Sequence, residues 1–161
     1  MDPPQECDPM AETKNPTNAN SPTTGKGVRC VITTPEATVL DTQAQFVSLP
    51  LFDGQRGIGR GHAPFIGRLG AGEVRITGER GGAADAVRRS FVEGGFVEVG
   101  QDTVTIITQR SVPGEKFDAT SARADLEKIR SVPARGDDAI ESRMRSEEAA
   151  RSLVRAAERR N

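Results

Sequence analysis

The sequence contains few of the residues that build covalent or metal-held scaffolds. Its 161 residues include two cysteines, Cys7 and Cys30, and a single histidine, His62. Two cysteines without a CxxC pair exclude a disulfide framework and a cysteine zinc site, and they suit a reducing compartment. With one histidine, a transition-metal site would consist mostly of carboxylates. We therefore expect no metal site.

Long apolar runs and an excess of charge of one sign are also missing. No segment approaches the roughly 18 consecutive apolar residues of a transmembrane helix, and the N-terminus lacks the basic start and apolar centre of a signal peptide. The net charge is −1, which disfavours a general nucleic-acid-binding surface. We expect a soluble protein without a nucleic-acid partner, although such a protein can still dock on a membrane-bound assembly.

Tryptophan and tyrosine are absent, and all six phenylalanines lie between Phe46 and Phe117. The bulky part of the core must therefore lie in that interval. Residues 1–27 instead contain five of the ten prolines among polar side chains. Because this segment has too little apolar surface to offset the entropy lost on ordering, we expect residues 1–27 to form a disordered tail.

Residues 28–112 show the two-residue period of half-buried β-strands. The alternating apolar positions are Val28, Cys30 and Ile32, then Val47, Leu49 and Leu51, then Val74 and Ile76. Turn residues separate these runs, and 13 of the 17 glycines fall between residues 54 and 100. Short strands divided by glycine-rich turns are typical of a sandwich or a barrel.

The pattern changes to a helical one in residues 113–161, where we expect two helices. Asp118 or Thr120 can cap the first helix, which should run to about Ser131 and carries apolar residues on one face. A break with proline and glycine at residues 133–136 ends this segment. The short connection makes the two helices an antiparallel hairpin.

Asp138, followed three residues later by Glu141, predicts a capping box for the second helix, which should run to about Arg159. Its apolar stripe consists of Ile140, Met144, Ala150, Leu153, Val154 and Ala157. Full burial of one large apolar side chain contributes roughly 1.5–3 kcal/mol, and the hairpin has few such side chains to share between its own packing and the sandwich. We therefore expect weak docking, so the hairpin is either a fixed cap or an element that can leave the sandwich.

Residues 53–64, DGQRGIGRGHAP, contain four glycines and the only histidine. A phosphate-binding loop needs a helix directly behind it, but Pro64 disfavours helical backbone at Ala63 and a strand pattern follows. We interpret the segment as a turn at the tip of the β-domain. A catalytic histidine needs a nucleophile or an orienting carboxylate, and no such motif accompanies His62, so we expect no catalytic residue and a turn-stabilising or contact role for His62.

Four segments together resemble the epsilon subunit of F-type ATP synthase, which is called delta in mitochondria. They are GIGRGHAPF at 57–65, GEVRI at 72–76, GGFVEV at 94–99 and VTII at 104–107. Their order and spacing match that family from about Val28 to the C-terminus. The resemblance implies a mainly β plus α fold, in which an N-terminal antiparallel β-sandwich of about ten strands (28–112) precedes a C-terminal antiparallel two-helix hairpin (113–161).

The resemblance also implies a non-catalytic rotor subunit of the central stalk of a proton-translocating enzyme. In that family the sandwich contacts the gamma subunit and sits on the ring of c subunits, so that rotation of the ring is coupled to the catalytic head. The loop that matches residues 53–62 faces the polar loops of the ring, which makes Gln55, Arg56 and His62 candidate ring contacts. Such a subunit lies peripherally on the cytoplasmic face of the bacterial inner membrane.

In many bacterial members of the family the helical hairpin extends towards the alpha and beta subunits and blocks ATP hydrolysis. Some members also bind ATP through a motif of Ile or Leu, Asp, two residues, then Arg-Ala. Asp118 and Ala122 fit this motif here, but Ser121 replaces its arginine, although Arg123 is nearby. Because the charged phosphate partner is lost, we expect no cofactor and weak or absent ATP binding.

An alternative from another class is a free-standing β-sandwich with a helical cap. Such a module would bind a small molecule or a peptide through the glycine-rich segment. Recovery of a gamma subunit with the tagged protein would discriminate the rotor subunit from this module.

Overall fold

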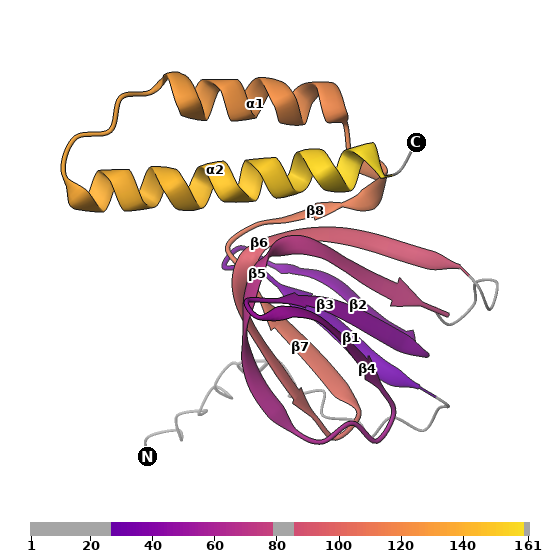
Figure 1. The fold of residues 1–161 in the computed structure, drawn as a ribbon. Helices are drawn as coiled ribbons and strands as arrows, with labels where there is room; N and C mark the ends of the chain where they lie inside the picture. The colour runs from indigo at the N-terminus through magenta and orange to yellow at the C-terminus, as the bar shows by residue number, and fades with distance from the viewer. Residues whose placement is uncertain (1–26, 79–85, 160–161) are drawn as a thin grey trace, which may run out of the picture.

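The computed structural model describes residues 27–78 and 86–159, and it contains eight strands followed by two α-helices (Figure 1). The strands are β1 (Val28–Thr33), β2 (Thr38–Ala44), β3 (Phe46–Leu51), β4 (Gly54–Gly59), β5 (Phe65–Thr77), β6 (Val87–Gly100), β7 (Thr103–Ile107) and β8 (Ser111–Pro113). After a short 3₁₀ turn, η1 (Gly114–Lys116), come α1 (Ala119–Ser131) and α2 (Asp137–Glu158). The tail expected at residues 1–27 lies, except for Gly27, outside the described residues.

The eight strands form one continuous sheet that folds over itself. Their order is β2-β1-β7-β6-β5-β3-β4, and β8 also pairs with β6. β5 and β6 are 13 and 14 residues long and pair antiparallel along most of their length. One half of β6 pairs with β7 and the other half with β8, so this strand belongs to both layers.

The predicted β-sandwich is confirmed, with two differences in detail. The structure has eight strands in place of about ten, because β5 and β6 continue through the bend instead of dividing into shorter strands. One pair, β1 with β7, is parallel, while the other pairings are antiparallel. The parallel pair places β7 beside β1, the first strand of the described residues.

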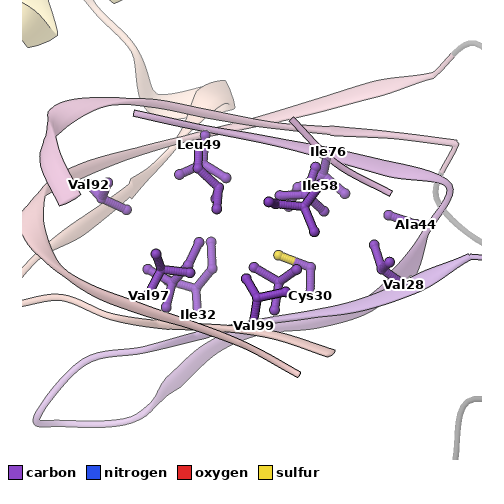
Figure 2. Packing of buried hydrophobic residues seen from close by; sticks show 14 of the residues in the cluster. Val28, Cys30, Ile32, Ala44, Leu49, Ile58, Ile76, Val92, Val97 and Val99 are labelled. Carbon is purple, nitrogen blue, oxygen red and sulfur yellow. The ribbon is translucent and has the colours of Figure 1, made fainter. Parts of the chain in front are cut away.

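Apolar side chains from the two layers face each other in the core (Figure 2). Leu49, Ile58 and Ile76 on one layer meet Cys30 and Val97 on the other, and each of these side chains is fully buried. Burial raises the pKa of the Cys30 thiol to about 12, because the thiolate would lose its hydration. Cys30 is thus a packing residue whose thiol stays protonated.

The bend of β6 depends on a pair of glycines at its middle. Gly94 and Gly95 have φ values of 101° and 114°, which side chains other than glycine rarely adopt. A Cβ atom at Gly95 would lie 2.0 Å from the backbone oxygen of Ile107. Glycine here lets β6 turn from one layer to the other while staying close to its neighbour.

Side-chain capping defines the start of α1 but not that of α2. The Asp118 carboxylate accepts hydrogen bonds from the backbone amides of Thr120 (3.1 Å) and Ser121 (3.0 Å), so the cap is Asp118, one of the two residues that the sequence offers for this role. The predicted capping box at Asp138 is wrong, because α2 begins at Asp137 and its N-cap is Gly136, two residues before Asp138, with φ 87° and no side-chain hydrogen bond. Asp138 instead lies in the first turn, where its negative charge interacts favourably with the positive end of the helix dipole.

The hairpin contacts the sandwich mainly through the C-terminal half of α2, and α2 lies between α1 and the sheet (Figure 1). A small cluster joins Phe91 and Phe117 to Ala156 and Ala157. Nearby, the Ser152 hydroxyl donates a hydrogen bond to the backbone oxygen of Ala71 (2.8 Å). The side chains that α2 contributes to this contact are therefore mostly small, whereas the two phenylalanines come from β6 and from the segment before α1.

The first half of the predicted apolar stripe on α2 is not buried. Ile140 is 40% exposed and Met144 is 64% exposed, because the hairpin end that connects α1 to α2 projects past the sheet (Figure 1). No described helix is long and apolar enough to cross a membrane.

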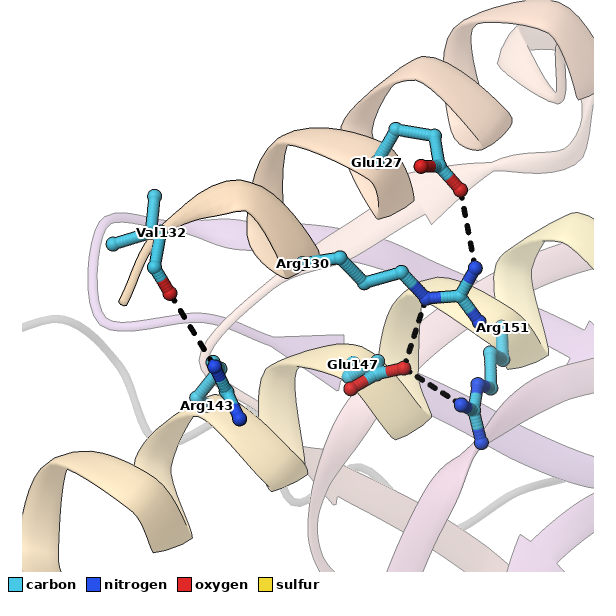
Figure 3. Close-up of polar contacts among 6 residues, drawn as sticks. All are labelled: Glu127, Arg130, Val132, Arg143, Glu147 and Arg151. Atoms are coloured by element: carbon cyan, nitrogen blue, oxygen red, sulfur yellow. Dashed lines mark hydrogen bonds and ion pairs between the residues drawn. The ribbon is translucent and has the colours of Figure 1, made fainter. Parts of the chain in front are cut away.

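Ion pairs hold α1 and α2 together towards that projecting end (Figure 3). The Arg130 guanidinium donates to Glu147 on α2 (3.0 Å) and to Glu127 on its own helix (3.1 Å). Glu147 also accepts from Arg151 (2.6 Å), and Arg143 donates to the backbone oxygen of Val132 (3.4 Å). The hydrogen bond from Arg130, with the nearby charge of Arg151, holds the pKa of the Glu147 carboxyl below its ordinary value of 4.5.

This lowered pKa predicts that the hairpin loosens in acid. A carboxyl whose pKa is lower in the folded than in the unfolded state stabilises the fold above its unfolded pKa, and the contribution is lost as the pH falls through the folded pKa. We expect the helical circular dichroism signal to fall as the pH drops below 4.5, the ordinary pKa of this carboxyl. Glu147→Gln should already weaken the hairpin at pH 7, whereas Glu148→Gln, at the exposed neighbouring position, should not; equal behaviour of the two variants contradicts the assignment.

Candidate functional site

The glycine-rich segment is only partly a loop. Gly54–Gly59 forms β4, which pairs with β3 and is the last strand at one edge of the sheet. The predicted turn at residues 53–64 is therefore wrong for its first half. The glycines are compatible with a strand here because the Phe46 side chain packs over them. A Cβ atom at Gly57 would lie 2.1 Å from Phe46 Cζ. Glycine at this position makes room for an aromatic ring on the neighbouring strand.

The structure brings two of the three predicted contact residues together at Phe65. The Arg56 guanidinium carbon lies 5.4 Å from the centre of the Phe65 ring, within the range of a cation–π contact. The His62 ring centre is also 5.4 Å from that of Phe65, and the two rings are tilted by 54°. Phe65 thus forms a common support for the two polar side chains.

Gln55 lies apart from this pair. Its side-chain oxygen accepts a hydrogen bond from the Ser48 hydroxyl (3.0 Å), and consecutive residues of a strand point to opposite faces of a sheet. Gln55 therefore belongs to the other face of β4 from Arg56. Both residues are exposed at the edge strand.

The turn that carries His62 is tied to a distant part of the chain. Asp102, between β6 and β7, accepts a hydrogen bond from the Gly61 amide (2.7 Å) and lies 3.7 Å from the Arg60 Nε atom. Sequence reasoning missed both Asp102 and Phe65 as parts of this site. Alternation of apolar residues marks Phe65 only as the start of a strand.

The geometry of this region suits binding to another molecule. The His62 Nδ1 atom lies 2.9 Å from the backbone oxygen of Ala63, so its partner in the described part of the chain is a main-chain group. Among residues 27–78 and 86–159, no cluster of three or more His, Cys, Asp or Glu side chains could hold a metal ion. Exposed donors on a rigid edge can form hydrogen bonds and ion pairs with polar loops of another molecule.

The second set of predicted residues lies at the start of α1. Both carboxylate oxygens of Asp118 serve as acceptors for the helix cap, and Ala122 is buried. Ser121 supplies one of the capped amides. Arg123 forms an ion pair with Glu158 near the end of α2 (2.5 Å), so these side chains hold the helix and the hairpin in the present structure.

Comparison with known proteins identifies the family to which this chain is similar. Residues 28–114 match the family model described as "ATP synthase, Delta/Epsilon chain, beta-sandwich domain". The ATP synthase epsilon chain of Rhodopirellula baltica is 42% identical over 106 residues, which cover 66% of this chain and 79% of the relative. The epsilon chain of Synechococcus sp. is 36% identical over 130 residues, which cover 79% of this chain and 90% of the relative.

A solved structure shares the fold over most of the chain. A chain in the cryo-EM structure of the Euglena gracilis mitochondrial ATP synthase, which contains OSCP, F1 and the c-ring, is 19% identical and has a TM-score of 0.67. The match covers 97% of this chain and 90% of that one. Together, the family model and the identity to the two bacterial chains show that this chain belongs to the ATP synthase delta/epsilon chain family, whose epsilon chains are non-catalytic subunits of that enzyme.

Proposed function

We propose that this chain is a non-catalytic rotor subunit of the central stalk, which couples rotation of the c-ring to the catalytic head through the gamma subunit. The observation that carries this proposal is the match of the whole sandwich, residues 28–114, to the delta/epsilon family model. The sandwich has a buried core between its two layers, and closely packed cores transmit strain, as coupling by rotation requires. Family membership disfavours the alternative of a free-standing binding module.

The site of contact with the c-ring, in this proposal, is the edge formed by β4 and the turn behind it. Arg56 and His62 present polar groups from one aromatic support, and Gln55 lies on the other face of the same strand. Polar groups held on a strand and a short turn lose little entropy when they meet a partner. The same proposal places the chain peripherally on the cytoplasmic face of a bacterial inner membrane.

Substitution of these residues in the assembled ATP synthase tests the contact. Arg56→Ala together with His62→Ala should weaken the association with the ring by about 1.5–3 kcal/mol for each charge-assisted hydrogen bond lost. We expect fewer protons pumped per ATP hydrolysed, measured in inverted membrane vesicles. Glu36→Ala, at the exposed turn after β1, is the control; unchanged coupling in the double variant would exclude this edge as the ring contact.

We propose further that the hairpin can leave the sandwich, extend towards the alpha and beta subunits and inhibit ATP hydrolysis. The support is the small contribution of α2 to its contact with the sandwich, which comprises Ala156, Ala157 and Leu153 and one hydrogen bond from Ser152. Moving the hairpin from almost always docked to almost always extended requires roughly 5.5 kcal/mol of differential binding. Contacts with the catalytic head would supply that free energy.

Deletion of residues 115–161 should raise the ATP hydrolysis rate of the assembled enzyme, because the inhibitory helices are removed. An unchanged rate eliminates the inhibitory role and leaves the coupling role in place.

Ser152→Ala should lower the ATP hydrolysis rate of the assembled enzyme, since losing the hydrogen bond to Ala71 favours undocking of the inhibitory hairpin by about 0.5–1.5 kcal/mol. Ser146→Ala is its control, because the Ser146 hydroxyl bonds to Ser142 within the same helix.

We also propose that the chain binds ATP weakly or not at all. Asp118 already satisfies two backbone amides, and Arg123 is paired with Glu158. Millimolar ATP should therefore leave the melting temperature of the full chain unchanged. A clear micromolar Kd by calorimetry would contradict this expectation, and Ser121→Arg, which restores the arginine of the motif, is the positive comparison.

A further inference from the structure

The side chain and the backbone of one residue join three segments at the end of the sandwich where His62 lies. Asp102 follows the last residue of β6 by two positions and has a φ of 54°. Its backbone oxygen accepts from the Arg29 amide (2.8 Å), its Oδ1 atom accepts from the Gly61 amide (2.7 Å), and its Oδ2 atom lies 3.7 Å from Arg60 Nε. The start of β1, the turn before β5 and the β6–β7 turn therefore meet at Asp102.

The Gly61 amide depends on this carboxylate. Gly61 has a φ of 75° and follows the last residue of β4 by two positions, so it lies beyond the residues of β4 that pair with β3. The backbone bond within the turn, from the His62 amide to the Gly59 oxygen, is long at 3.3 Å. A carboxylate that accepts from an amide at 2.7 Å forms a short, charge-assisted bond, and it is the stronger of the two restraints.

The Asp102 carboxylate is less exposed to water and salt than its charged partner Arg60. Its side chain is 29% exposed, whereas that of Arg60 is 64% exposed. Water and salt screen a half-buried charge less than a surface charge. The bond to Gly61 is therefore expected to persist at physiological ionic strength, while the longer pair with Arg60 adds little.

We propose that Asp102 is a positioning residue for the contact edge: its carboxylate fixes the Arg60–His62 turn, and the turn fixes His62 against Phe65 beside Arg56. Asp102 acts through the Gly61 amide and does not itself contact the c-ring. This inference rests on the proposed function of the edge, and it assigns to the β6–β7 turn a part in coupling.

Substitutions at Asp102 can remove the carboxylate without breaking its own turn. Two-residue hairpin turns with positive φ accept asparagine, aspartate and glycine. Asp102→Asn therefore keeps the backbone geometry and one oxygen acceptor, and Asp102→Gly keeps the geometry but removes the acceptor. Gln101→Gly is the matched control, because Gln101 has a similar φ of 49° and carries no carboxylate.

Amide hydrogen exchange of the full chain, measured by NMR, tests the restraint itself. Asp102→Gly should speed exchange of the Gly61 amide roughly tenfold, as expected for the loss of one charge-assisted bond. Asp102→Asn should restore most of the protection, and Gln101→Gly should leave it unchanged. Exchange at Val104 in the core should be the same in all variants. An unchanged Gly61 rate in Asp102→Gly overturns the inference.

Coupling in the assembled ATP synthase tests whether the restraint matters for function. Asp102→Gly should lower the number of protons pumped per ATP hydrolysed, and Asp102→Asn should restore it. If Asp102 acts through His62, the double variant of Asp102→Gly and His62→Ala should be no worse than His62→Ala alone. Additive losses, or normal coupling in Asp102→Gly when His62→Ala is uncoupled, overturn the positioning role.

The two proposals fail in different ways. If His62→Ala and Arg56→Ala leave coupling intact, the contact edge is wrong and the positioning role falls with it, whatever the exchange data show. If those variants uncouple the enzyme but Gly61 exchange does not depend on Asp102, only the inference about Asp102 is wrong.

Discussion

The long pairing of β5 with β6 determines where the other strands lie. Because both strands continue through a bend, one sheet supplies both layers of the sandwich, and the apolar faces of β1 and β3 come to oppose each other. Glycine is required at the bend, since a side chain at Gly95 would overlap the backbone of the adjacent segment. The bend thus builds the core and orients every element that is attached to it.

The same bend also sets where the hairpin docks. The register of β3 against β5 shifts between Ser48 and Leu51, opposite the segment of β5 that contains Ala71. Pro50, which has no amide to donate, lies in that interval. The Ser152 hydroxyl bonds to the Ala71 oxygen, so an irregularity in the sheet provides an acceptor for the helix.

The hairpin is held on the sandwich by apolar packing, and its two helices are held together by ion pairs. Near the sandwich, Phe91 and Phe117 pack with alanines of α2, and this contact weakens little with salt. Towards the projecting end, Arg130 and Glu147 join the helices through partly exposed ion pairs, each of which contributes modestly and is screened by salt. In a hairpin built in this way, the tip can change without disturbing the base.

Local sequence patterns determined much of this protein: the alternating strands, the helix capped by Asp118 and the break before the second helix follow from neighbours within a few positions. Tertiary structure decided the rest. Gly57 is part of a strand because Phe46 from another strand covers it, and Met144 is exposed because the sheet ends before the hairpin does. The bond from Gly61 to Asp102 joins residues 41 positions apart, and no periodicity or motif specifies such a contact, because it exists only once the sheet has folded over its core.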